Sequence, residues 1–83
     1  MTTIMHKDVL IEVTAGCLGR LFAEYKDRLS EKDYLDIRLN LVKIRKQIYS
    51  SECEDLDFYV MLDKIKDTYD EAEKRLINTP NNE

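Results

Sequence analysis

Few side chains in this chain are suited to acid–base or nucleophilic chemistry. There is one histidine, His6, and there are two cysteines, Cys17 and Cys53, neither of which has a histidine close to it in sequence. Covalent catalysis needs a nucleophile beside a base, and a zinc site needs three or four His, Cys or carboxylate ligands. We therefore expect a non-enzymatic protein with no catalytic residue, no metal, no cofactor and no small-molecule substrate.

The two cysteines are expected to be reduced structural residues. The spacing of Cys17 and Cys53 fits no zinc or redox motif, and each occupies a position where a small apolar residue would serve. A disulfide between them remains the alternative for an oxidising compartment.

Carboxylates are abundant, with 17 Asp and Glu against 13 Lys and Arg and a net charge of -4. No segment has the twelve-residue spacing of a calcium loop with its glycine. One acidic row is predicted on the solvent side of the last helix: Asp63, Asp67, Asp70 and Glu71. We interpret it as a solvated face, with two alternatives: docking on a basic protein, or a decoy that imitates nucleic-acid phosphate.

The basic residues form one cluster, which consists of Arg38, Lys43, Arg45 and Lys46. Such a cluster can rest on a phosphate backbone, but the negative net charge argues against nucleic acid as a partner. We expect a solvated helix face whose cations pair with acids of the last helix.

The elements that position these side chains are predicted to be helices. With 83 residues, 43% of them hydrophobic, the chain can form one small core and therefore one domain over residues 1–83. From Arg20 to Thr79 it has neither glycine nor proline, which excludes a Gly-rich phosphate loop or a Gly-built hairpin there. We find no secretory signal and no apolar run long enough to cross a membrane, and we expect a cytoplasmic protein without membrane insertion.

Periodicity predicts helices at about 7–29, 31–49 and 53–77, followed by a frayed tail at 78–83. Ser30 and Ser51 are the predicted N-caps of the second and third helices. The first helix has this core stripe: Leu10, Ile11, Cys17, Leu18, Leu21, Phe22, Tyr25 and Leu29. Short turns favour an antiparallel three-helix bundle, up-down-up, with a helical hairpin that completes its core by dimerisation as the alternative.

The middle helix is apolar over more of its circumference than one buried face requires. Its heptad row is Tyr34, Ile37, Leu41, Ile44 and Ile48, and a second row, rotated by roughly 140°, is Leu35, Leu39, Val42 and Tyr49. Arg38 and Arg45 lie between the rows and Lys46 lies beside the second. Together the rows span about 220°, against a little over 100° for a helix packed on one side.

This second row has three interpretations. It can be core, because a middle helix touches both neighbours. It can be an apolar patch with a basic rim that contacts another protein. It can also mediate a symmetric homodimer.

A strip of small residues lies opposite the core stripe of the first helix: Ala15, Gly16, Gly19 and Ala23. Each glycine inside a helix costs about 1 kcal/mol relative to alanine, so the strip can serve close approach of a partner helix. We favour the plainer interpretation, in which the first helix bends, or begins only after Gly16 or Gly19, with Ile4 to Val13 as a separate turn or arm.

These patterns favour a small non-catalytic binding module that masks or scaffolds a larger protein through the middle helix. In size and composition it resembles bacterial and phage inhibitors, immunity proteins and chaperone-like accessory proteins. A self-assembling homodimer and the acidic decoy are the alternative functions.

Overall fold

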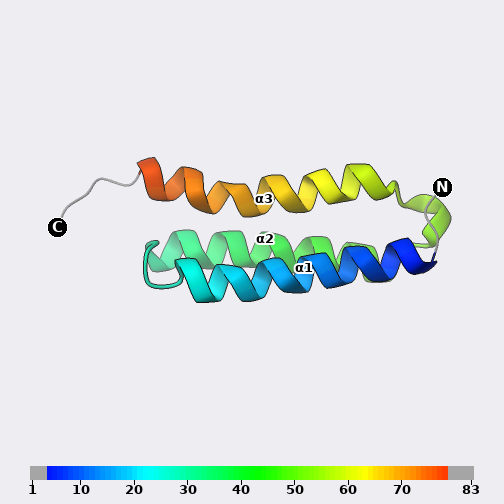
Figure 1. Cartoon of the computed structure of the whole chain (residues 1–83), viewed down its shortest axis with the longest axis horizontal. Helices are drawn as coiled ribbons and strands as arrows, with labels where there is room; N and C mark the ends of the chain where they lie inside the picture. Colours follow the sequence, from blue (N-terminus) through cyan, green and yellow to red (C-terminus); the bar gives the residue numbers. More distant parts are fainter. Residues whose placement is uncertain (1–3, 79–83) are drawn as a thin grey trace.

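The computed structural model describes residues 4–78, with side chains described as far as residue 76. Three helices follow one another, α1 (Ile4–Tyr25), α2 (Glu31–Ser50) and α3 (Phe58–Asn78), and a short 3₁₀ turn, η1 (Cys53–Asp55), precedes α3. They run up, down and up along a rod of 48 × 17 × 15 Å, and each helix packs against both others (Figure 1). This arrangement confirms the predicted antiparallel three-helix bundle. Asn78, predicted as tail, belongs to α3, and residues 79–83 lie outside the described part.

The turn between α1 and α2 comes earlier than predicted. The helix ends at Tyr25 rather than at residue 29, and the carbonyl of Tyr25 accepts hydrogen bonds from the amides of Arg28 and Leu29, both at 3.0 Å. Residues 26–29 form the turn, and Ser30, the N-cap of α2, has the extended backbone of a capping residue. Its side-chain oxygen accepts the amide of Asp33 at 3.1 Å, which confirms the predicted cap.

The third helix begins at Phe58, later than the predicted residue 53, and Ser51 does not cap it. The Ser51 hydroxyl donates to the carbonyl of Gln47 at 2.7 Å and so belongs to the end of α2. The cap of α3 is Asp57, whose carboxylate accepts the amide of Val60 at 3.1 Å. The interruption at η1 lets Leu56 turn inward, where it is 7% exposed and part of the core.

Contrary to expectation, α1 is a single helix from Ile4 through both Gly16 and Gly19. Contact with α2 holds its first turns: the ammonium of Lys7 donates to the carbonyl of Tyr49 at 3.2 Å and to that of Ser51 at 2.7 Å. Those carbonyls end α2 and have no partner within the helix, so Lys7 satisfies them with a favourable charge. Tertiary contact therefore overrides the low helix propensity of the glycines.

The core lies along the axis of the rod, between the three helices. The heptad row of α2 is entirely buried, as predicted, together with these side chains of the other segments: Leu10, Leu21, Leu29, Leu56, Met61, Ile65 and Ala72. Thr14 is also fully buried, and its hydroxyl donates to the carbonyl of Leu10 at 2.7 Å. Phe22 departs from the predicted core stripe, because it lies at the edge of that arc and remains 57% exposed.

Candidate functional site

The second row of α2 is not enclosed by the bundle. Leu35 is 50% exposed, Leu39 51% and Tyr49 58%, while Val42 is half-buried. Since the heptad row already completes the core, these four side chains form a further apolar surface.

The neighbouring helices show on which side of α2 this row lies. Asp33 and Asp36 contact Arg75 of α3, and Gln47 accepts a hydrogen bond from Lys64 of α3. At about 100° per residue these α2 positions lie on one side of the helix and the second row lies on the other. The second row therefore faces away from α3, next to α1.

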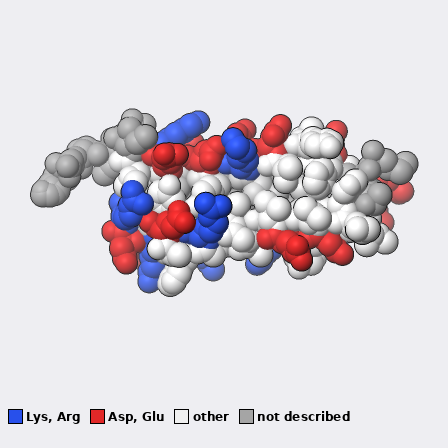
Figure 2. Space-filling view, viewed as in Figure 1, with Lys and Arg blue, Asp and Glu red and all other residues white. Residues whose placement is uncertain are grey.

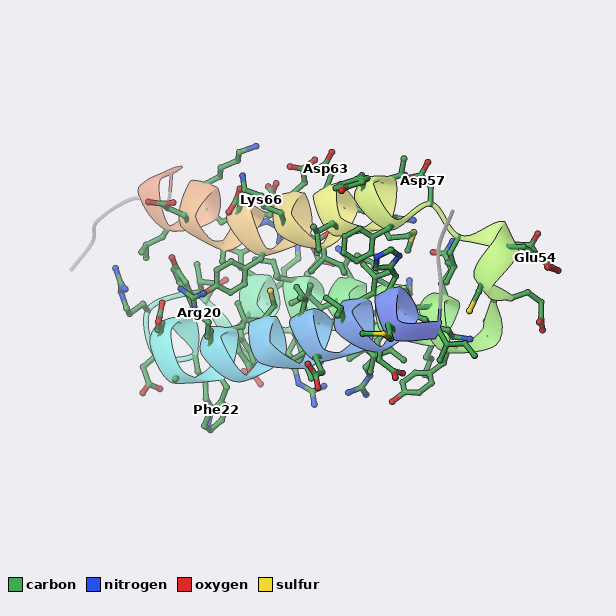
Figure 3. The ribbon with its side chains drawn as sticks, turned by 45° about the vertical axis from the view of Figure 1, so that its right-hand side comes forward. Arg20, Phe22, Glu54, Asp57, Asp63 and Lys66 are labelled. Atoms are coloured by element: carbon green, nitrogen blue, oxygen red, sulfur yellow. The ribbon has the colours of Figure 1, made fainter. Side chains whose placement is uncertain are left out.

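Phe22 of α1 extends this surface. The tight turn at residues 26–30 and the contact of Lys7 with Tyr49 set an antiparallel register in which Phe22 lies at the level of Leu35. Figure 3 shows Phe22 pointing from α1 to the side opposite α3. We call the five apolar residues of this face the α1–α2 seam: Phe22, Leu35, Leu39, Val42 and Tyr49. The periodicity of the first helix predicts Phe22 in the core stripe, but its position at the end of that wide arc already indicates partial exposure.

Cations lie within and beside the seam, with Arg38 and Arg45 between the two rows of α2 and Lys46 beside the second row. Arg38 and Lys46 are exposed, Arg45 is half-buried, and the ammonium of Lys26 lies 4.9 Å from the centroid of the Phe22 ring. Within the small-residue strip of α1, Ala15 and Gly19 lie nearest the seam. All four residues of the strip are exposed: Ala15, Gly16, Gly19 and Ala23. A Cβ atom at either glycine would meet nothing within 4 Å, so packing inside this chain does not require the glycines.

The predicted pairing of the basic cluster with acids of the third helix is wrong. In the ion pairs between these two helices, the cation belongs to α3 and the acids belong to α2. The guanidinium of Arg75 lies 3.1 Å from Asp33 and 2.8 Å from Asp36. Within residues 4–76, no ion pair involves the members of the basic cluster, Arg38, Lys43, Arg45 and Lys46. The cations along the seam are therefore without a carboxylate at salt-bridge distance.

Two of the four carboxylates in the acidic row of α3 lie beside cations of the same helix. Asp63 and Asp67 are exposed, whereas Asp70 is 3.3 Å from the ammonium of Lys66 and Glu71 is 3.5 Å from the guanidinium of Arg75. On the face of the molecule seen in Figure 2, Lys and Arg atoms lie mostly over the C-terminal ends of α1 and α3. Uncharged atoms and carboxylates cover the half in which α1 and α3 begin. Two of the four carboxylates are thus partly neutralised.

A shallow groove of about 440 Å³ runs between α1 and α3 and is lined by Val13, Cys17, Leu62, Ile65 and Tyr69 together with charged residues. Burial raises the pKa of the Cys17 thiol, opposed by the nearby Arg20 guanidinium. Burial also raises the pKa of Tyr69, with Glu24 adding to the effect. Both groups therefore stay protonated at neutral pH.

The residues suited to chemistry are not brought together. The His6 ring packs on Phe58 with ring centroids 4.7 Å apart, and Cys17 and Cys53 are free, half-buried thiols. Within the described residues no group of three or more His, Cys, Asp or Glu could hold a metal ion. No helix in this part of the chain has the length and apolarity to cross a membrane.

Comparisons of this chain with protein-family models, with curated proteins and with solved structures find no match.

Proposed function

We propose that this chain is a small non-catalytic binding module that masks or scaffolds a larger protein through the α1–α2 seam. The observation that carries the proposal is the exposure of half of Leu35 and Leu39 in a bundle whose core is already complete. Apolar side chains grouped on one face and rimmed by cations have the anatomy of a protein contact. An inhibitor, an immunity protein or a chaperone-like accessory protein would use such a face.

The available binding energy supports a contact that also uses polar groups. Covering the exposed half of one large apolar side chain contributes about 1 kcal/mol, and so the five seam residues contribute roughly 5 kcal/mol. Association costs at least about 4 kcal/mol, which would leave little for affinity from the apolar anchors alone. The rim and the surrounding surface must therefore take part.

The proposal is tested by affinity capture from the native cell with the wild-type chain and a Leu35→Asp/Leu39→Asp variant. Val60→Asp is the matched control, because Val60 is 59% exposed on α3, away from the seam. We expect the wild-type chain and the control to retain the same protein and the seam variant to lose it while remaining folded. Retention of that protein by all three would contradict the proposal.

Homodimerisation is the second candidate, favoured by the same apolar exposure, since a row on one helix can meet its own copy about a twofold axis. Sedimentation at micromolar to millimolar concentrations distinguishes the two functions. A monomer at all of these concentrations would exclude the homodimer.

The acidic decoy has less support, because Asp70 and Glu71 already lie beside Lys66 and Arg75.

A further inference from the structure

The shape of the α1–α2 seam fits a helix better than an extended peptide. The seam lies between two antiparallel helices, on the face that α3 leaves uncovered, and both helices run its full length. From Leu35 to Tyr49 it extends about 21 Å at 1.5 Å per residue. A fourth helix of about four turns would match this length.

The two borders of the seam differ in height. On the α2 side the large side chains of Leu35, Leu39 and Tyr49 project into solvent. On the α1 side Ala15 and Gly19 have small side chains or none, so the helix backbone is accessible. This difference in side-chain size lets the backbone of a neighbouring helix come close to α1, while the side chains on one side of that helix pack against the large residues of α2. The open space around both glycines agrees with this asymmetry.

Charge decides which helix fits. Arg38, Arg45 and Lys46 border the seam without a carboxylate at salt-bridge distance among residues 4–76, whereas other cations such as Arg75, Arg20 and Lys66 lie beside acids of this chain. A second copy would bring the same cations to the same face, and like charges that meet at a contact oppose binding. A helix flanked by Asp and Glu would compensate them.

We propose that the α1–α2 seam binds an amphipathic helix of about four turns, whose apolar stripe is flanked by acidic residues, as the fourth helix of the bundle. This inference rests on the proposed function and names the chemistry of its partner. The apolar stripe covers the seam, and acidic residues of the partner helix pair with Arg38, between the two rows of α2, and with Lys46, beside the second row.

Two synthetic helical peptides of about 18 residues test the inference. They share one leucine stripe and differ in their flanks, which are Glu in one and Lys in the other. We expect the Glu-flanked peptide to bind the full chain at least tenfold more tightly in fluorescence anisotropy, with affinity that falls as salt rises. Amide chemical shifts in NMR should change along the seam residues of α1 and α2. Equal binding of the two peptides, no binding of either, or shifts confined to the α1–α3 groove would overturn the inference.

Charge reversal tests the rim directly. Arg38→Glu/Lys46→Glu changes two exposed side chains, so the fold should persist, as circular dichroism can verify. We expect this variant to prefer the Lys-flanked peptide, while the Val60→Asp control keeps the wild-type preference. An unchanged preference in the reversed variant would contradict the role of the rim.

The outcome separates this inference from the proposed function. If neither peptide binds but Leu35→Asp/Leu39→Asp still loses a captured protein, the acidic-helix inference fails and the seam remains a protein contact. If the chain alone forms a dimer that the same substitutions dissociate, a second copy occupies the seam and the inference also fails.

Discussion

At the scale of single residues, Arg75 is the charged side chain that ties α3 to α2. Its side chain is 28% exposed and lies beside Asp33, Asp36 and Glu71. The hydrogen bond to Asp36 is the largest cause that raises the pKa of Arg75, so the guanidinium is charged at neutral pH. Without this cation, three neighbouring carboxylates would repel one another.

Arg75→Leu should therefore lower the free energy of unfolding by about 1 kcal/mol, more than a typical exposed ion pair contributes. Urea denaturation of the variant measures this change. Lys66→Leu is the control, because the Lys66–Asp70 pair is exposed and lies within one helix. Equal effects of the two substitutions would show that Arg75 has no special role.

The thiol of Cys17 should react slowly with iodoacetamide at neutral pH. Burial raises its pKa, so the reactive thiolate is scarce at pH 7 and increases as the pH rises through the alkaline range. Mass spectrometry of alkylated peptides at pH 7 and pH 10 measures this dependence on the folded chain. A Cys17 rate that is fast at pH 7 and flat with pH would contradict the predicted burial.

At the scale of elements, α1 should be stabilised by filling its small-residue strip. Gly16→Ala and Gly19→Ala each remove a costly helix-interior glycine, and the new methyl group meets nothing within 4 Å. We expect each to raise the free energy of unfolding by roughly 0.5–1 kcal/mol. Thermal or urea unfolding measures the gain. A loss of stability would mean that another backbone lies close to α1 in the isolated protein.

The start of α3 provides a second element-scale prediction. Asp57→Ala should lower the free energy of unfolding by about 1 kcal/mol because its carboxylate caps the amide of Val60. Ser51→Ala, at the predicted N-cap that α3 does not use, should have a smaller effect. A larger loss at Ser51 than at Asp57 would place the helix start where the sequence pattern predicted it.

These elements also show what the sequence could and could not predict. The cap at Ser30 and the buried heptad row of α2 follow from local patterns, and both are confirmed. The ends of α1 and the start of α3 depend on contacts between distant residues. Lys7 extends α1 by bonding to the end of α2, and the burial of Leu56 delays α3, which local periodicity does not reveal.

At the scale of the whole molecule, the surplus apolar surface is the property that links fold to proposed function. The sequence predicted the second row of α2 but left open whether the bundle encloses it. It could not place Phe22 beside that row or show that Arg75 reverses the pairing of α2 with α3, because both depend on how the helices are rotated. Those two findings leave the seam apolar and its α2 side basic.

The central claim is that the α1–α2 seam contributes little to the stability of the isolated chain. The free energy of unfolding of Leu39→Asp, measured by urea denaturation beside Leu41→Ala, tests it most directly. We expect Leu39→Asp to change that energy by less than about 1 kcal/mol, since its side chain is half exposed, and the buried Leu41→Ala to cost about 2–5 kcal/mol. A loss of several kcal/mol for Leu39→Asp would place the row in the core and contradict the account.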